Sequence, residues 1–314
     1  MNIAFFFPGQ GSQSLNMMAG FNDMAIVKET FQQASAALDQ DLWALMNGED
    51  NTALNETVNT QPLMLTAGIA SWHVYQQLHG QRPVMLAGHS LGEYTALVAA
   101  GSLGFNDAVK LVRLRAQLMQ EAVPTGQGAM AAILGLDDDI VRQVCLQAQN
   151  ELSGTVAEAV NYNSPGQVVI AGSTTAISRA CELAKAAGAK RALPLPVSVP
   201  SHCRLMKPAA DKLAVALAQI KIETPQIPVL HNVDVATHSE PEAIKQALVR
   251  QLYSPVRWTE TVRKLMAEGI TEFAECGPGK VLAGLARRID KSASCTALTS
   301  VENMESFIAA HSAS

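Results

Sequence analysis

Short apolar runs alternate with longer amphipathic segments along most of the chain. Residues 3–7 (Ile-Ala-Phe-Phe-Phe) and 84–87 (Val-Met-Leu-Ala) are apolar throughout, as strands buried on both faces are. Residues 66–78 and 91–100 instead match helices, the second one ending at Gly101. Strands that alternate with helices are typical of a mostly parallel sheet whose strands are connected through helices. We therefore predict an α/β fold.

The pattern changes after residue 125. The sequence from there to residue 198 predicts strand, helix, two strands around a turn, helix and strand, at residues 129–136, 137–149, 156–162, 167–171, 174–187 and 191–195. The order βαββαβ is that of a ferredoxin-like unit. We expect residues 126–198 to form a small subdomain inserted in a large one, which consists of residues 1–125 and 199–314. Residues 227–233 and 271–276 are expected to be further strands of the large subdomain.

Composition excludes several classes of protein. Hydrophobic residues make up 48% of the 314 residues and charged residues 16%, which fits a folded chain. The net charge of -5 argues against a nucleic-acid binder. The longest stretch without a formal charge, residues 57–81, contains Asn59, Gln61 and His73, so no membrane span is predicted. Five cysteines without a C-x-x-C pair indicate a reduced, metal-free, cytoplasmic protein.

Ser90 is the candidate nucleophile. Gly88-His89-Ser90-Leu91-Gly92 is a G-x-S-x-G motif between a predicted strand and a predicted helix. In that setting the two glycines allow a strained turn that exposes the serine hydroxyl. The amide of Leu91 can then point at the oxygen of an attacked carbonyl. The alternative is an ordinary glycine-rich turn.

Two other glycine-rich turns are weaker signals. Gly9-Gln10-Gly11 follows the first predicted strand, but a dinucleotide-binding fingerprint would need glycine where Ser14 stands. This turn can equally direct the amide of Gln10 into the crevice that holds Ser90. Gly277-Pro278-Gly279-Lys280 lacks the Ser or Thr and the upstream spacing of a phosphate loop, so we expect a turn that leads into a helix.

His202 is the candidate base. It follows a proline-rich run, and we expect it in the first turn of a helix capped by Ser201. The positive end of a helix disfavours imidazolium and keeps the ring neutral, as a general base requires. Five other histidines are more simply explained as surface or packing residues. They are at positions 73, 79, 231, 238 and 311.

Arg115 is the most informative single residue. Apolar residues lie three and four positions before and after it, at positions 111, 112, 118 and 119. It therefore projects from the apolar face of its helix, where a guanidinium requires an anion. The anion is either a carboxylate of the protein or a substrate carboxylate held by two hydrogen bonds.

Taken together, these residues resemble the malonyl-CoA:acyl carrier protein transacylases, relatives of the acyltransferase domains of fatty-acid and polyketide synthases. The resemblance covers nearly the whole chain. It rests on Pro8-Gly9-Gln10-Gly11-Ser12-Gln13, Gln61-Pro62, Gly88-His89-Ser90-Leu91-Gly92-Glu93, Arg115, Asn161-Tyr162-Asn163-Ser164-Pro165-Gly166-Gln167, Ser201-His202 and Gly277-Pro278-Gly279. Seven motifs in this order are far more specific than G-x-S-x-G alone.

The resemblance implies a hydrolase-like core, the ferredoxin-like insert, and an active site between the two. It implies Ser90 as nucleophile, His202 as base and the amides of Gln10 and Leu91 as oxyanion hole. It further implies a main-chain carbonyl, that of Gln251, in the third triad role. The residues implied to bind the substrate or to line its pocket are Arg115, Gln61 and Asn232.

The implied reaction is ping-pong transfer of a malonyl group from malonyl-CoA, through a malonyl-serine ester, to the phosphopantetheine thiol of an acyl carrier protein. It would supply extender units for fatty-acid synthesis and need neither a metal nor another cofactor, and we expect a monomer. Ser201 stands where malonyl-selecting synthase domains often carry an aromatic residue, so the sequence leaves open another extender unit of polyketide type. It also leaves open a serine esterase and a dinucleotide-binding module.

Overall fold

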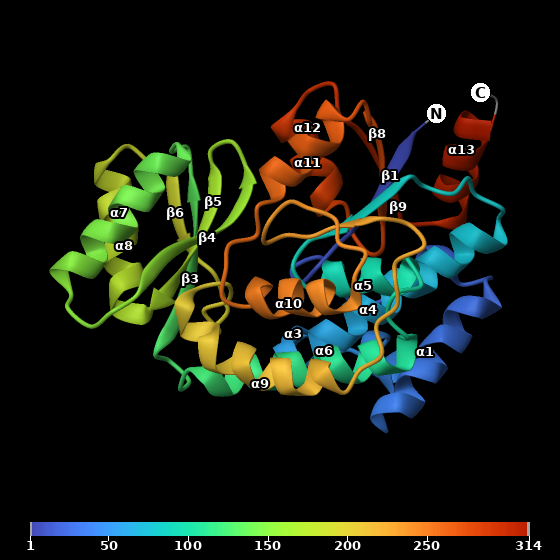
Figure 1. Cartoon of the computed structure of the whole chain (residues 1–314), viewed down its shortest axis with the longest axis horizontal. Coiled ribbons are helices and arrows are strands. Elements are labelled where there is room, and N and C mark those ends of the chain that lie inside the picture. Colours follow the sequence, from blue (N-terminus) through green and yellow to red (C-terminus); the bar gives the residue numbers. More distant parts are fainter. Residues whose placement is uncertain (1, 313–314) are drawn as a thin grey trace.

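The structure is a computed structural model that describes residues 2–312. It has two lobes, each built around its own sheet (Figure 1). The sheet of the large lobe has the order β7-β2-β1-β8-β9 and all its pairings are parallel. Its strands are β1 (Ile3–Phe7), β2 (Met85–Gly88), β7 (Val229–Leu230), β8 (Glu272–Cys276) and β9 (Ser294–Leu298). The predicted α/β fold is thereby confirmed.

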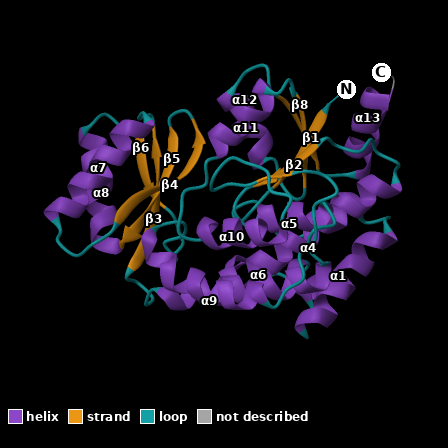
Figure 2. Cartoon of the chain, viewed as in Figure 1, coloured by secondary structure: helices purple, strands orange, loops and turns teal. Residues whose placement is uncertain are grey.

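The small lobe is formed by an antiparallel sheet of order β4-β5-β3-β6, with two helices on one face (Figure 2). Its elements are β3 (Gly128–Leu134), α7 (Asp138–Glu151), β4 (Ala157–Ser164), β5 (Gln167–Ser173), α8 (Thr174–Ala186) and β6 (Arg191–Pro194). This is the predicted order βαββαβ, and all six elements fall within the predicted insert, residues 126–198.

Helices of the large lobe cover both faces of its sheet. Those that precede the small lobe are η1 (Ala19–Phe21), α1 (Ala25–Leu38), α2 (Leu42–Met46), α3 (Asn51–Asn55), α4 (Thr57–Gln77), α5 (Gly92–Ala99) and α6 (Phe105–Ala122). Those that follow it are η2 (Arg204–Met206), α9 (Lys207–Ala218), α10 (Pro241–Gln251), α11 (Trp258–Ala267), α12 (Val281–Ile289) and α13 (Val301–Ser312). Within residues 2–312, none of the helices combines the length and the apolarity that crossing a bilayer requires.

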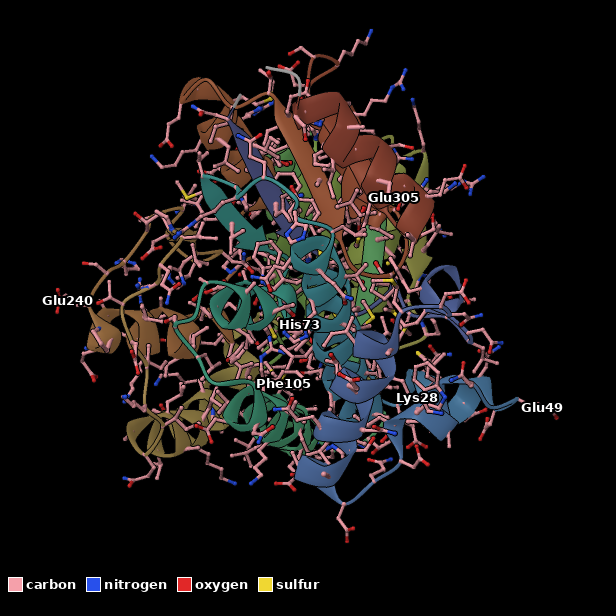
Figure 3. The ribbon with its side chains drawn as sticks, turned by 90° about the vertical axis from the view of Figure 1, so that its right-hand side faces the viewer. Lys28, Glu49, His73, Phe105, Glu240 and Glu305 are labelled. Atoms are coloured by element: carbon pink, nitrogen blue, oxygen red, sulfur yellow. The ribbon has the colours of Figure 1, made fainter. Side chains whose placement is uncertain are left out.

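Strand β1 shows how the sequence forms the central layer. Its five residues are fully buried, and successive side chains point to opposite faces of the sheet. Phe5 packs edge-on against Trp72 of α4 on one face, whereas Phe6 packs against Trp258 of α11 on the other. The strand is apolar throughout because both of its faces are covered. Charged side chains such as Glu49 and Glu240 point outward at opposite edges of the molecule (Figure 3).

Two of the predicted elements have other bounds in the structure. Helix α4 begins at Thr57 and not at residue 66. Pro62 lies inside the helix without ending it, and most residues of the helix are buried. Strand β7 has two residues in place of the seven predicted at 227–233, because the chain leaves the sheet at His231. Residues 3–7 form strand β1 as predicted, and the strand predicted at 271–276 is β8, which begins at Glu272.

Candidate active site

Ser90 lies in a sharp turn between β2 and α5. Its φ of 53° is in the left-handed region, which costs a residue with a side chain about 1–3 kcal/mol. The turn leaves no room for side chains at its two glycines: a Cβ at Gly88 would lie 1.9 Å from the carbonyl carbon of Gly92, and one at Gly92 would lie 2.0 Å from the oxygen of Phe7. The G-x-S-x-G pattern is therefore a packing requirement, and the resulting turn exposes the Ser90 hydroxyl in a cavity.

Ser90, His202 and Gln251 are connected by hydrogen bonds. Ser90 Oγ lies 2.7 Å from His202 Nε2, and His202 Nδ1 lies 2.8 Å from the backbone oxygen of Gln251. Since a carbonyl oxygen only accepts, Nδ1 carries the proton and Nε2 is free to accept the proton of Ser90. The structure thus brings together the three residues that the sequence analysis selected for this role.

The local setting of His202 differs from the prediction. Ser201 caps no helix, and His202 lies in a turn with φ 64°, before the short helix η2. A helix end is therefore not what keeps the ring neutral. Complete burial lowers the pKa of His202 to about 3, and the nearby charge of Arg115 contributes to this lowering. The predicted state of the ring is right, but its cause is desolvation and a neighbouring cation.

The backbone amides of Gln10 and Leu91 lie at the same cavity. Both residues line it, and the two loops touch, since a Cβ at Gly9 would lie 2.4 Å from the oxygen of His89 and 3.6 Å from the nitrogen of Leu91. Within residues 2–312, neither amide donates a hydrogen bond to another residue. Two free donors beside a serine hydroxyl are suited to bind a developing oxyanion.

Arg115 is buried in α6 and has no carboxylate in contact. It donates hydrogen bonds to Gln61 Oε1 (2.7 Å), Gln251 Oε1 (3.0 Å) and Ser90 Oγ (3.3 Å). Its guanidinium lies 5.3 Å from the centre of the Tyr94 ring. Among the salt bridges of the described chain, none includes Arg115. Of the two anions that the sequence left open, a protein carboxylate in direct contact is excluded for these residues.

Asn232 does not occupy the pocket-lining position that the resemblance implied. It is fully buried and lies beneath the nucleophile turn, away from the wall of the cavity. Its Oδ1 accepts a hydrogen bond from the amide of Ser90 (2.8 Å), and its Nδ2 donates to the oxygen of Gly88 (2.7 Å). Asn232 therefore holds the strained turn in place, and it does not line the pocket.

The side chain of Gln251 is as involved as its backbone. Its Nε2 donates to the backbone oxygen of Ser90 (2.8 Å) and to Glu93 Oε2 (3.2 Å), while its Oε1 accepts from Arg115. Sequence reasoning used only the carbonyl of this residue and assigned no role to Glu93. The available signal was the position of Glu93, directly after the motif and on the first turn of the helix that the motif begins.

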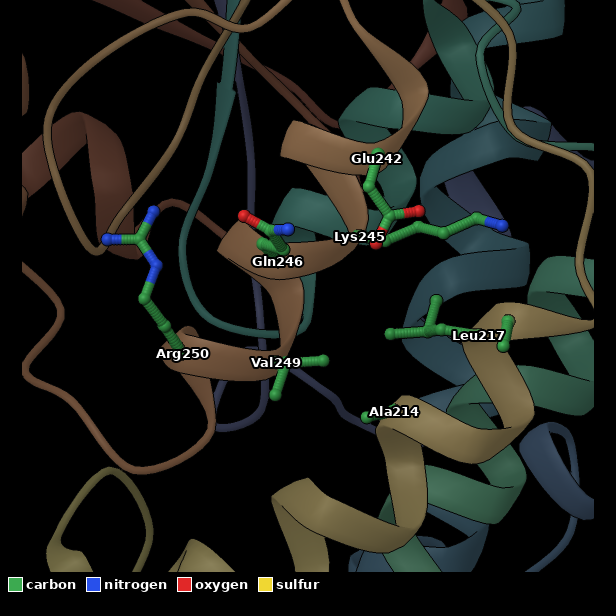
Figure 4. Close-up of a pocket in the computed structure, with 8 residues that line it drawn as sticks. Ala214, Leu217, Glu242, Lys245, Gln246, Val249 and Arg250 are labelled. Atoms are coloured by element: carbon green, nitrogen blue, oxygen red, sulfur yellow. The ribbon is translucent and has the colours of Figure 1, made fainter.

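The cavity at Ser90 has a volume of about 430 Å³ and lies between the lobes. The large lobe contributes Gln10, Gln61 and Arg115, and the small lobe contributes Met130 and Asn161. A second hollow of about 370 Å³ lies between α9 and α10, and Figure 4 shows that Leu217, Val249 and Arg250 border it. Nowhere in residues 2–312 do three or more His, Cys, Asp or Glu side chains gather as a metal site would need.

Comparison with known proteins gives consistent matches over nearly the full length. Residues 4–307 match the acyl transferase domain family. The malonyl CoA-acyl carrier protein transacylase of Escherichia coli K12 is 57% identical over 94% of this chain and 95% of its own length. That of Bacillus subtilis is 46% identical over 96% and 95% of the two chains.

Solved structures agree with the sequence comparison. The malonyl CoA-acyl carrier protein transacylase from Coxiella burnetii superposes with a TM-score of 0.96 at 50% identity, covering 98% of this chain and 97% of its own. A malonyl-transacylase in complex with its type II polyketide acyl-carrier protein superposes with a TM-score of 0.97 at 50% identity, covering 99% of this chain and 100% of its own.

Proposed function

This chain belongs to the acyl transferase family, and we propose that it transfers the malonyl group of malonyl-CoA to the thiol of an acyl carrier protein. It is an acyltransferase, and its relatives that bear the name malonyl CoA-acyl carrier protein transacylase match more than nine-tenths of its length. Malonyl-CoA and an acyl carrier protein are accordingly its partners in the reaction, which supplies malonyl units to fatty-acid synthesis.

One observation carries the choice of a malonyl group. A buried guanidinium with no carboxylate in contact, that of Arg115, lies within hydrogen-bond distance of the Ser90 hydroxyl. An acyl group on Ser90 that carries its own carboxylate could reach this cation, whereas an acetyl group could not supply an anion. A thioester of a dicarboxylic acid is therefore the substrate class that fits the site.

In the first half of the proposed reaction, Ser90 Oγ attacks the thioester carbonyl of malonyl-CoA while His202 Nε2 takes its proton. The negative charge that develops on the carbonyl oxygen is stabilised by the amides of Gln10 and Leu91. The C–S bond then breaks, and the proton on His202 passes to the leaving CoA sulfur. The products are a malonyl-serine ester and free CoA.

The second half reverses these steps with another thiol. His202 takes the proton of the phosphopantetheine thiol of the carrier protein, and the sulfur attacks the malonyl-serine ester. When the ester C–O bond breaks, Ser90 Oγ recovers the proton from His202. The burial of His202, which holds its pKa at about 3, returns the ring to the neutral state that each half-reaction requires.

Mass spectrometry after brief mixing with malonyl-CoA tests the function and the nucleophile together. We expect the protein to gain one malonyl group and Ser90→Ala to gain none, with the fold intact because a hydroxyl on a turn contributes little to packing. A Ser90→Ala protein that still gains one malonyl group would show that another residue is the nucleophile.

Three further properties of the protein are predictions from its sequence. They are a monomeric state, a cytoplasmic location and a reaction that needs no metal or cofactor beyond the two thiol carriers. A polyketide carrier protein is a specific alternative acceptor, since one of the similar structures holds a type II polyketide acyl-carrier protein. Transfer rates to purified carrier proteins of the two pathways would decide between them.

A further inference from the structure

Glu93 is a buried carboxylate that the reaction does not use directly. It lies in the first turn of α5, three residues after Ser90, and none of its surface is exposed. Three hydrogen bonds reach it: from the backbone amide of Asn232 (2.9 Å), from Gln251 Nε2 (3.2 Å) and from His231 Nδ1 (2.6 Å). An ionised carboxylate is costly to bury without a partner, so its position requires an explanation.

Gln251 lies between this carboxylate and Arg115. A carboxylate accepts hydrogen bonds only and a guanidinium donates only. The amide of Gln251 meets both demands, because its Nε2 faces Glu93 while its Oε1 faces Arg115 Nη2 at 3.0 Å. The orientation of this amide is therefore fixed by two opposite charges, one on each side.

Glu93 also acts on Arg115 through its charge. Burial lowers the pKa of Arg115, and the groups that oppose this effect by their charge are Tyr94 and Glu93. The phenol of Tyr94 is neutral under working conditions, because burial raises its pKa to about 12. Glu93 is thus the negative charge that offsets Arg115, although its direct contact of this kind is with His231 Nδ1 and, within residues 2–312, it forms no salt bridge with Arg115.

We propose that Glu93 is the counter-ion of Arg115, coupled to it through the amide of Gln251, and that this arrangement leaves the guanidinium free for the substrate carboxylate. The inference rests on the proposed function, in which that carboxylate belongs to the malonyl group. A carboxylate in direct contact would neutralise Arg115 equally well but would occupy the N–H groups that the substrate needs. Separation by one amide keeps the charge balanced and engages one N–H of Arg115 Nη2, while the Nε N–H has no partner among residues 2–312.

The arrangement also makes Glu93 a positioning residue. Through Asn232 it supports the Ser90 turn, and through Gln251 it supports the residue whose backbone oxygen holds His202. Loss of its charge and loss of its shape should therefore have separable effects. The charge acts on the preference for malonyl, and the shape acts on the rate with every thioester.

The first experiment compares Glu93→Gln with Glu93→Asp by the rates of acylation with malonyl-CoA and acetyl-CoA. Glu93→Gln removes a negative charge next to the site that receives the malonyl carboxylate, so the malonyl-to-acetyl ratio should rise about three- to thirtyfold. Glu93→Asp keeps the charge, so its rates should fall while the ratio stays within twofold of the unmodified protein. In Arg115→Ala the ratio should fall.

Glu275→Gln is the matched control. Glu275 is another fully buried carboxylate that accepts backbone hydrogen bonds, from Leu282 and Ala283, but it lies on β8 outside the cavity. Assayed at pH 8, this variant should leave the ratio unchanged. A Glu93→Gln ratio that is unchanged or lower would overturn the proposal.

The second experiment does not depend on catalysis. A double-mutant cycle of thermal stability uses Glu93→Gln, Arg115→Gln and both together. Each single variant removes one of the two opposite charges and leaves the other buried. The double variant should therefore lose less melting temperature than the two single variants lose together. A double variant that folds where Glu93→Gln does not would support the same conclusion.

Strictly additive losses in that cycle would refute the coupling even if malonyl transfer itself is confirmed. Conversely, a native protein that acquires no malonyl group would refute the proposed function and leave the result of the cycle standing.

Discussion

His202 is kept in the neutral form that can accept a proton by its burial, since desolvation and the charge of Arg115 both disfavour its protonated form. Its Nδ1 proton is held by the backbone oxygen of Gln251, so the free Nε2 is directed at Ser90. A carboxylate in the place of that carbonyl would favour imidazolium and would raise the pKa of the ring. A carbonyl is therefore suited to a base that has to return its proton twice in each cycle.

A pH profile checks this account. With a pKa of about 3 in the folded protein, His202 stays neutral at every pH above about 4, and acylation by malonyl-CoA should show no loss of rate between pH 8 and pH 5. His89, the other imidazole at the cavity, also has its pKa lowered by burial. Rapid-mixing measurements of CoA release should therefore give a flat kcat/KM. A decrease centred near pH 6.5 would show that the base titrates as an exposed histidine does.

The side chain of Gln251 should matter for the reaction as well as its backbone oxygen. Truncation in Gln251→Ala keeps the backbone oxygen that holds His202 but removes one hydrogen bond each from Arg115, Glu93 and the backbone oxygen of Ser90. Each hydrogen bond lost by these buried charged or polar groups costs about 1–3 kcal/mol, so acylation should slow at least tenfold and the melting temperature should fall. A role of the carbonyl alone, which is what the resemblance implies for Gln251, would instead predict a mild effect. A Gln251→Ala protein with nearly full activity would refute the side-chain network.

Among the elements, helix α12 begins over a buried acid. Glu275 of β8 accepts hydrogen bonds from the amides of Leu282 (3.1 Å) and Ala283 (2.8 Å) in the first turn of α12. Burial raises the pKa of Glu275 to about 7, although the two amides lower it in part. The carboxylate serves as a cap for the helix but remains costly to ionise.

The stability of the protein should depend on pH through this residue. Because the pKa rises from 4.5 in the unfolded chain to about 7 in the fold, the folded state binds more protons between these values, and stability falls as pH rises through this window, by up to about 3 kcal/mol. Glu275→Gln should remove this part of the slope, as measured by chemical denaturation at pH 4.5, 6 and 8. Glu305→Gln, at an exposed position on α13 (Figure 3), is the control. An equal slope in Glu275→Gln would contradict the assignment.

Elements formed by local pattern could be predicted from the sequence. Strand β1 is apolar because both faces of the sheet are covered, and the small lobe follows from its strand, helix and turn signals. Contacts distant in sequence left no such signal. The two-residue strand β7 ends where the amide of Asn232 turns to Glu93, 139 positions away, and the setting of His202 depends on residues of α6 and α10. The site residues were predictable as chemical types, but their support was not.

At the scale of the whole molecule, the cavity with Ser90 lies between lobes that fold around separate sheets. Met130 of β3 and Asn161 of β4 line it together with Gln10 and Arg115 of the large lobe. Each lobe has its own apolar core, formed for the small lobe by residues of its sheet and of α7 and α8.

A carrier protein that delivers a flexible phosphopantetheine arm must bind near the opening of this cavity, and acyl carrier proteins of this pathway are acidic. With a net charge of -5, the enzyme needs a local basic surface to attract such a partner.

One basic cluster meets this need at the junction of the lobes. Arg287, Arg288 and Lys291, at the end of α12, border a hollow of about 590 Å³ together with Pro165 of the small lobe. Within residues 2–312, no salt bridge includes any of the three cations. A second pair, Lys190 and Arg191, is exposed on the small lobe. We expect the first cluster to bind the carrier protein, because it lies against both lobes and no carboxylate neutralises its charges.

Charge reversal separates the two halves of the reaction. The double variant Arg287→Glu/Lys291→Glu should raise the KM for the carrier protein at least tenfold, and most strongly at low salt, because surface charges are screened by ions. Acylation of Ser90 by malonyl-CoA should stay within twofold. Lys185→Glu, a reversal at the end of α8, is the control for a cation at a helix C-terminus. If malonyl-CoA acylation slows instead, the cluster binds the phosphates of CoA. If Lys190→Glu/Arg191→Glu has the larger effect on the carrier, the carrier binds to the small lobe.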